Sequence, residues 1–439
     1  MYNAYFLLHF SSKPQKIIMI KVGTIPQYDD PILLFSIASF DMMSGIRVLD
    51  TYNYSSSCKA ISNDTLNMTF RMVISNVHRQ DEECFFNNNF LVKKIDLKEL
   101  DLLIFNSIFL IKKTKDVYYS VELVLKRCDD FLKMPLVDTF SEVMKELATA
   151  TRNLLIRNEG LNSLKSFVDK KVNDLNVCLN SGIWELPKLN FIVVDQPFFS
   201  TCLTSHFQTQ MRTIIELNTN EGNKTSDLKN FLCHFLLDYQ LRLSSFNILQ
   251  VPNPYLYLQI VEKQTAPIEE ILIEFPKPCT WIRLQEKQVF QSPNTEIYLN
   301  IHSDFLNSSL MNDIDDPEIK RKLSKIKQQF KITTVNNPTK ITNNIISTIN
   351  DNSKAKDFIC EQKLNSLVKM SLILISLTNS LLKKTGTYPI PIETTTGFFK
   401  MLKINNKHDA LLIINIAQNS DPMILKKLGI NKKNQLQFK

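Results

Sequence analysis

The sequence predicts three folded units in succession: an α+β N-terminal domain built on a five-stranded antiparallel sheet, an α/β central domain and a small all-α C-terminal domain. Three observations support this prediction. Strand-like segments dominate before residue 130, strand and helix patterns mix between residues 189 and 261, and helical periodicity dominates after residue 355. With 439 residues and 44% apolar side chains, the chain is long enough for each unit to bury its own core.

The N-terminal domain opens with two strand candidates. Residues 31–40 form an apolar run of strand length, residues 46–54 alternate in polarity, and Gly45 marks a turn between them. Apolar side chains then recur near every 3.6 residues over residues 58–79, which indicates a helix. We therefore expect a hairpin followed by a short helix.

Three further strand candidates complete the predicted sheet, at residues 85–92, 102–112 and 117–126. The charged segment 112–116 lies between the last two and favours a hairpin turn. From Leu136 to about Val177, apolar residues recur at spacings of three, four and seven, which predicts long helices. Strands followed by long helices describe an antiparallel sheet with helices packed against it.

The central domain shows strand and helix patterns in turn. Residues 190–195 contain a short apolar core typical of a strand, and a helix candidate through Leu203, Phe207 and Met211 follows. Residues 228–243 are again helical. Two further strand candidates, next to prolines, cover residues 246–252 and 255–261. This succession predicts an α/β arrangement.

The last third of the chain contains a polar segment followed by a series of helix candidates. Residues 304–352 are polar and charged, and we expect a polar linker or mobile insertion there. Helix candidates separated by Gly, Pro and Asn then follow at 355–384, 394–403 and 408–418. The predicted domains therefore cover residues 28–186, 187–303 and 353–439, with the polar segment 304–352 before the last.

Composition disfavours several classes of protein. The chain has 52 Lys plus Arg against 44 Asp plus Glu, and a net charge of +8 is too small for its length to indicate nucleic-acid binding. The eight cysteines lack zinc or disulfide spacing and the N-terminus lacks secretory features, so we expect a cytoplasmic protein with reduced thiols. Polar residues interrupt the apolar stretch Leu367–Leu382, which favours a buried helix over a membrane span.

The sequence contains no recognisable catalytic or cofactor motif. Its eight glycines form no phosphate-binding loop, and its six histidines form no H-E-x-x-H motif. Ser205–His206 and Cys233–His234 each place a nucleophile beside a base. Adjacent helical residues point in different directions, so packed side chains are the favoured interpretation. We predict no catalytic residue, no cofactor and no metal ligand.

Two basic features are candidates for binding a partner. Lys320, Arg321 and Lys322 are the first residues of a basic cluster that contains one aromatic residue, Phe330. The cations of this cluster can contact phosphates of lipid or RNA, or simply form a solvated helix face. Arg47 follows a turn and is the right residue type to reach a phosphate, although an arginine in such a strand more often pairs with an acid. These four residues are the predicted partner-binding residues.

Two stretches resemble DENN-module proteins. Residues 32–54, ILLFSIASFDMMSGIRVLDTYNY, resemble the opening of a longin domain, with a strand, a Gly-containing turn and a second strand of the G-x-[RK]-V-L kind. Residues 397–424, GFFKMLKINNKHDALLIINIAQNSDPMI, resemble the closing helices of the DENN family of the chromosome 9 open reading frame associated with amyotrophic lateral sclerosis and frontotemporal dementia. Between them, residues 191–196 and 251–260 are similar to two strands of that family.

The resemblance implies a longin-like domain, a central DENN domain and a C-terminal all-α DENN domain. It also implies a regulator of Rab or Arf-like small GTPases in endosomal, lysosomal or autophagic membrane traffic. The implied partners are the GTPase, a second DENN protein and a WD-repeat protein, with no nucleic acid and at most peripheral membrane contact. Such a protein is an exchange factor or a subunit of a GTPase-activating complex, without a catalytic site of its own. The alternative is an adaptor that only assembles DENN partners.

The chain also departs from the family pattern. Ile46–Arg47 stands where a Pro-Lys step is expected, and residues 304–352 have no counterpart. In GTPase-activating complexes an arginine finger stabilises charge on the transferring phosphoryl group. The resemblance implies that a partner subunit supplies this finger, with Arg47 as the candidate within this chain.

Overall fold

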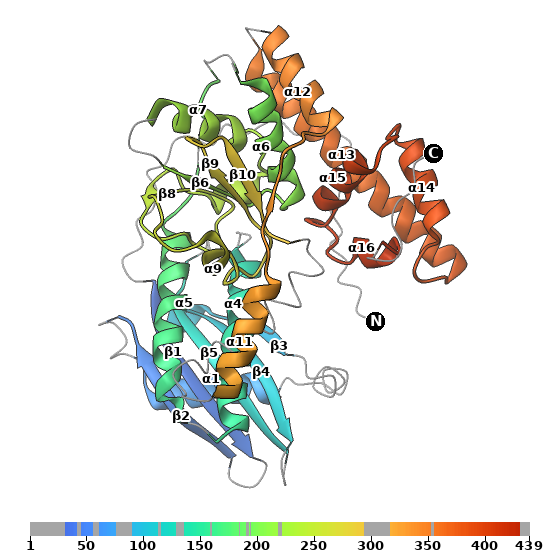
Figure 1. Cartoon of the computed structure of the whole chain (residues 1–439). Coiled ribbons are helices and arrows are strands. Elements are labelled where there is room, and N and C mark those ends of the chain that lie inside the picture. Colours follow the sequence, from blue (N-terminus) through green and yellow to red (C-terminus); the bar gives the residue numbers. More distant parts are fainter. Residues whose placement is uncertain are drawn as a thin grey trace.

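The computed structural model describes residues 31–41, 45–55, 61–75, 90–112, 116–128, 136–158, 160–183, 185–189, 193, 195–217, 222–293, 317–352 and 355–430. Figure 1 shows three groups of elements: a blue-to-cyan sheet at one end, a smaller sheet beyond it, and orange-to-red helices beside the smaller sheet. These groups correspond to the three predicted units. The domain bounds themselves stay a prediction.

The N-terminal unit contains a sheet of five antiparallel strands in the order β2-β1-β5-β4-β3. The prediction of a five-stranded antiparallel sheet is confirmed. The two outer strands, β2 and β3, are the open edges among the described elements. The strands are β1 (Ile32–Asp41), β2 (Gly45–Asn53), β3 (Leu91–Leu97), β4 (Leu102–Lys112) and β5 (Asp116–Lys126).

Helices cover both faces of this sheet. Helices α4 (Leu136–Ile156) and α5 (Leu164–Leu179) lie on one face, where Phe140 stacks on Phe105 with ring centroids 4.5 Å apart. Helix α1 (Asn63–Ser75) packs on the other face through a separate apolar cluster. Strands buried on both faces read as nearly continuous apolar runs, which explains the sequence of β4, LLIFNSIFLIK.

Two local predictions for this unit differ from the structure. The strand predicted at 85–92 is β3, and it begins at Leu91; residues 76–89 lie outside the described part of the chain. The helical region predicted from 136 to 177 divides into α4 and α5. Asn158 at φ 58° leaves the helical conformation near the end of α4, and a short 3-10 turn, Leu161–Ser163, precedes α5.

The central unit has a mixed sheet in the order β11-β10-β9-β6-β8-β7, so its architecture is α/β. Strand β6 runs parallel to both β8 and β9, and β7 runs parallel to β8, whereas β10 and β11 are antiparallel to their neighbours. The strands are β6 (Thr213–Glu216), β7 (Ile248–Leu249), β8 (Leu258–Val261), β9 (Thr280–Arg283), β10 (Gln288–Gln291) and β11 (Thr333–Thr334). The helices are α6 (Gln196–Gln208), α7 (Gly222–Cys233), α8 (Asp238–Arg242) and α9 (Ile268–Leu272).

Several elements of the central unit were not predicted from the sequence. Strands β6, β9 and β10 have four residues each, too few for an alternation to stand out. The predicted strand 190–195 falls mostly on residues outside the described ranges, and the described Val193 bonds through its backbone N–H to Asn350 Oδ1 at 3.2 Å. Met211, expected in a helix, follows α6 with φ 67°.

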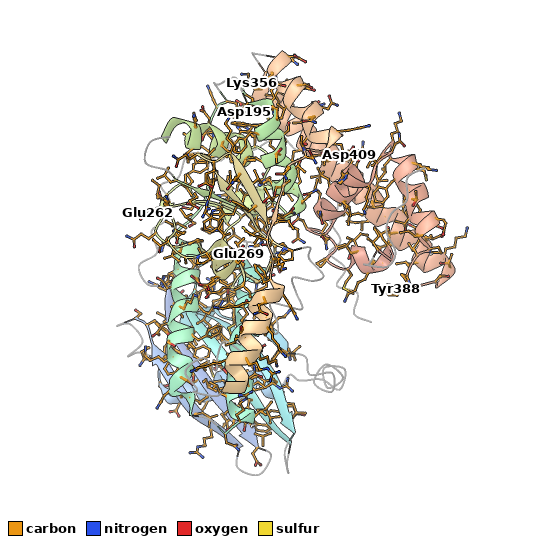
Figure 2. The ribbon with its side chains drawn as sticks, viewed as in Figure 1. Asp195, Glu262, Glu269, Lys356, Tyr388 and Asp409 are labelled. Atoms are coloured by element: carbon orange, nitrogen blue, oxygen red, sulfur yellow. The ribbon has the colours of Figure 1, made fainter. Side chains whose placement is uncertain are left out.

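The C-terminal unit is helical, as predicted. The three helices expected after residue 355 correspond to α13, α14 and α15 within two residues at each end. Asp409 (Figure 2) ties α15 to α12, because its Oδ1 accepts from the backbone N–H of Ile341 at 3.1 Å. The helices are α12 (Lys340–Asp351), α13 (Lys356–Thr385), α14 (Ile392–Met401), α15 (Lys407–Ala417) and α16 (Ile424–Lys427).

The segment predicted as a polar linker contains regular structure. Residues 317–352 form α11 (Pro317–Gln329), β11 and α12, so this part is not an unstructured linker. Helix α11 was not expected because few apolar residues anchor it: Leu323, Ile326 and Phe330 stand among lysines, yet all three are buried. β11 pairs with β10 and extends the central sheet.

Helix α13 contains the apolar stretch expected to form a buried helix. Among the described helices, it is the one long and apolar enough to span a membrane by length and composition alone. Cys360, Leu364, Leu367 and Leu374 are buried along one side of it. Other sides carry exposed polar residues such as Lys369, so the helix is buried along one face rather than throughout.

Candidate partner-binding surfaces

The first serine–histidine pair that could have formed a nucleophilic site is packed inside the central unit. His206 is fully buried, its Nδ1 lies 2.9 Å from Thr213 Oγ1, and burial lowers its pKa to about 3. Ser205 Oγ lies 2.7 Å from Thr280 Oγ1 instead of the imidazole. The two neighbours therefore serve different packing contacts.

The cysteine–histidine pair behaves in the same way. His234 Nε2 lies 2.7 Å from the backbone oxygen of Pro187, and Cys233 donates to the backbone oxygen of Asn230 at 3.0 Å. Burial raises the pKa of Cys233 to about 12, which keeps the thiol protonated and poorly nucleophilic near neutral pH. Within the described ranges, no group of three His, Cys, Asp or Glu side chains is placed to hold a metal ion.

Arg47 lies on an open sheet edge. It belongs to β2, pairs through the backbone with Ser39 of β1, and has an exposed side chain. Within the described part of the chain its guanidinium makes no ion pair, so it does not take the acid-paired role that is common in strands. An edge strand offers unpaired backbone groups to a partner, and Arg47 places a cation beside them.

Lys320, Arg321 and Lys322 lie on the exposed side of α11. Ile326 and Phe330, on the buried side, pack with Trp281 in the core of the central unit. Arg47 belongs to the N-terminal sheet and α11 is anchored in the central unit. The four predicted partner-binding residues therefore belong to two elements, β2 and α11.

A cavity of about 430 Å³ adjoins the second open edge of the N-terminal sheet. It lies between α1 and β3 and combines the apolar Met72, Val73 and Ile95 with charged residues of β3. Its mixed lining fits a surface that accepts part of a protein partner better than a closed substrate pocket. Both open edges of this sheet thus have features that suit contact.

A buried charged cluster, missed by the sequence reasoning, joins the N-terminal and central units. Lys171 of α5 lies 2.5 Å from Glu146 Oε2 of α4 and 2.8 Å from the hydroxyl of Tyr255 in the central unit. The Tyr255 hydroxyl also donates to Glu146 at 2.9 Å. All three side chains are less than 9% exposed. The ion pair itself lies within the N-terminal unit, and the Tyr255 hydroxyl of the central unit contacts both of its members, so a shift between the units would break both of these hydrogen bonds.

Further polar contacts surround this triad. Asn253, in the loop before β8, donates through Nδ2 to the backbone oxygen of Asp174 on α5 at 2.8 Å. Burial raises the pKa of the Asp174 carboxyl to about 6, while Lys171 acts in the opposite direction. At the rim, Lys170 pairs with Glu274. The joint between the two units therefore combines several polar contacts with apolar packing that the two units share.

A second buried carboxyl lies under α1, on the opposite face of the N-terminal sheet. Glu122 of β5 is fully buried; its Oε1 accepts from Asn106 Nδ2 at 2.9 Å, and its Oε2 lies 2.9 Å from Thr69 Oγ1. Thr69 Oγ1 is also 2.8 Å from the backbone oxygen of Leu66. Since the hydroxyl has one proton and the Leu66 oxygen can only accept, both contacts are hydrogen bonds only if Glu122 is protonated and donates.

The environment of Glu122 agrees with a neutral acid. Burial raises its pKa from 4.5 to about 8, and the hydrogen-bond contacts with Thr69 and Asn106 only partly oppose this shift. No cation lies among its described hydrogen-bond partners. The carboxyl therefore stays protonated at neutral pH, and α1 covers it without an ion pair.

Glu216 occupies the place where α/β sheets commonly bind ligands. It ends β6, which lies between two parallel neighbours, β8 and β9. Its Oε2 accepts from Trp281 Nε1 at 2.7 Å and from Arg283 Nε at 3.1 Å. The carboxylate is thus engaged by the chain's own donors and has a structural role.

Among the described residues, the N-terminal sheet has open edges, α11 exposes a basic face, and the buried polar groups described above are engaged in packing. The C9orf72-like protein family model matches residues 68–298, more than half of the chain. The chain belongs to this family, a DENN-type regulator family, and the resemblance stated from the sequence is confirmed. The match extends from within α1 to just beyond β10. No curated protein matches the chain in a sequence search.

Proposed function

We propose that the chain binds a small GTPase of the Rab or Arf-like kind and regulates its nucleotide cycle in endosomal, lysosomal or autophagic membrane traffic. The observation that carries the proposal is membership of a DENN-type regulator family over residues 68–298. An exchange factor opens the switch regions of its GTPase through contact and needs no catalytic side chain. In a GTPase-activating complex, the chain would instead support a finger supplied by a partner subunit.

The geometry of the N-terminal sheet supports a contact of this kind. The edge strand β2 exposes backbone donors and acceptors together with the Arg47 guanidinium. The buried triad of Lys171, Glu146 and Tyr255 fixes this sheet relative to the central unit. A surface that spans both units is thus pre-organised, which lowers the entropic cost of binding.

The proposed partners besides the GTPase are a second DENN protein and a WD-repeat protein. Arg47 serves the GTPase or the second DENN protein, and Lys320, Arg321 and Lys322 form a separate contact for an anionic partner. We place the protein in the cytoplasm, with recruitment to a traffic membrane, and assign it no nucleic acid and no cofactor.

Binding and turnover assays with the full chain test this proposal. In the binding assay, a panel of Rab and Arf-like GTPases in GDP-loaded, GTP-analogue-loaded and nucleotide-free forms is passed over the immobilised protein. In the turnover assay, nucleotide release and GTP hydrolysis are measured with the chain alone and with its DENN partners. We expect a preference for one nucleotide form and a change in one of the two rates. Binding of DENN partners with both rates unchanged would favour the adaptor function. Indifference to all three forms without partner binding would contradict both.

A further inference from the structure

Helix α11 presents a dense basic face to solvent. Its described side chains, residues 320–329, include five cations and no acid. The five cationic side chains are exposed, and Lys331 follows directly after the helix. The cations of the helix are Lys320, Arg321, Lys322, Lys325 and Lys327.

The opposite face fixes this helix to the central unit. Leu323, Ile326 and Phe330 recur at spacings of three and four and are 5%, 6% and 2% exposed. Lys327 lies 3.6 Å from Glu270 of α9, and Figure 2 shows the neighbouring Glu269 on α9 near the end of α11. The helix is thus folded and oriented before any partner arrives.

We propose that the basic face of α11 binds the surface of an anionic lipid bilayer. Anionic headgroups offer charge at every position and need no matched geometry, and clusters of four to eight Lys or Arg on an amphipathic helix are typical of such binding. The face lacks what other anionic partners use. Its aromatic residue, Phe330, is buried and cannot stack on RNA bases, and no exposed apolar side chain among residues 320–329 can anchor a protein interface.

Binding through this face is electrostatic and peripheral. Ile326 and Phe330 belong to the core of the central unit and Leu323 is buried, so the described apolar side chains are not free to insert and the helix lies on the headgroups. Each cation near the surface strengthens binding roughly fivefold, and added salt weakens it. Such a contact places the N-terminal sheet, with its proposed GTPase surface, next to the membrane that carries the GTPase.

The test is co-sedimentation of the full chain with vesicles of phosphatidylcholine alone or mixed with phosphatidylserine, at low and high salt. We expect binding only to the mixed vesicles and loss of binding at high salt. The triple variant Lys320→Gln, Arg321→Gln, Lys322→Gln should bind on the order of a hundredfold more weakly, from three losses of roughly fivefold each. A matched control, Lys369→Gln, Lys383→Gln, Lys384→Gln on the exposed side of α13, removes the same charge and should bind like the unmodified chain.

Three results would overturn the proposal. The first is that the unmodified chain does not bind phosphatidylserine vesicles, and the second is that both triple variants lose vesicle binding equally. The third is that single-stranded RNA displaces the chain from vesicles at concentrations where inositol phosphates do not displace it. The α11 variant is also assayed for GTPase binding in solution. Retained GTPase binding shows that the two proposals are independent, so failure of lipid binding would leave the proposed function standing.

Discussion

Two buried glutamates in the same domain are neutralised in opposite ways. Glu146, at the joint with the central unit, lies 2.5 Å from the ammonium of Lys171. Glu122, under α1 on the other face of the sheet, has the neutral partners Thr69 and Asn106 among the described residues. The first is held as an ion inside a rigid joint, and the second is held as a neutral acid whose proton is part of the packing.

The contrast shows what each contact contributes. A buried ion pair adds little net stability relative to an apolar pair, but losing one member is costly. Here the Tyr255 hydroxyl bonds to both members and ties the pair to the central unit. A neutral buried acid has no charged partner to lose, and it makes the free energy of unfolding depend on pH. The joint therefore suits a fixed binding surface, whereas the α1 face suits an element whose packing responds to conditions.

The largest expected effect comes from removing the cation of the joint. Lys171→Met removes the ammonium that faces the buried Glu146 carboxylate, and we expect a loss of about 3–5 kcal/mol in the free energy of unfolding by urea denaturation. The matched control is Lys165→Met on the same helix, because the Lys165–Asp169 pair is exposed and should change stability by less than about 1 kcal/mol. Equal effects of the two variants would show that the buried triad does not hold the joint.

The pH dependence of stability separates the two glutamates. The pKa of Glu122 is raised by folding from 4.5 to about 8, so the folded state binds more protons between these values. The free energy of unfolding should therefore fall by a few kcal/mol as pH rises through this window and level off above it. Glu122→Gln keeps the shape of the neutral acid, with an amide that donates to Thr69, and should flatten this part of the curve.

Other groups titrate in the same window, so the informative quantity is the difference between the two curves. Asp174, whose pKa is raised to about 6, contributes a slope of the same sign in both proteins. Parallel curves for the unmodified chain and Glu122→Gln, measured by urea unfolding between pH 5 and pH 9, would contradict a neutral Glu122.

The smallest expected effect is at the hydroxyl that links Glu122 to α1. Thr69→Val removes the group between Glu122 and the Leu66 oxygen, and we expect a loss of about 1 kcal/mol in the free energy of unfolding at pH 6. Thr149→Val on α4 removes a hydroxyl bonded only to its own helix backbone and should cost less than about 0.5 kcal/mol. A cost for Thr69→Val no greater than this control would show that the hydroxyl is not part of the Glu122 network.

The sequence predicted the N-terminal sheet and the C-terminal helices because their elements are long. Strands of nine to eleven residues, such as β1, β2, β4 and β5, and the 30-residue α13 show their periodicity clearly. The four-residue β6, β9 and β10 gave no such signal, and α11 was hidden because lysines outnumber its apolar anchors. Short elements depend on tertiary contacts that spacing alone does not reveal.

The sequence contains an indication of the buried ion pair that the sequence analysis did not use. Lys171 lies three residues after Val168 and four before Leu175, and Glu146 lies three after Val143, so both charges occupy positions on buried helical stripes. A charge at such a position indicates a buried pair, although its partner on another element is visible only in the fold. The basic residues Arg47 and Lys320 to Lys322 were identified as exposed candidates from residue type, and the structure places them on separate units.

Titration of a small GTPase with the purified full chain tests the central claim, action through contact, most directly. The GTPase is the one selected by the panel, measured in its GDP-bound and nucleotide-free forms. We expect different affinities for the two forms and a weaker complex for Arg47→Glu, while Arg157→Glu at the exposed end of α4 leaves binding unchanged. Equal affinity for both forms, insensitive to Arg47→Glu, would contradict the claim.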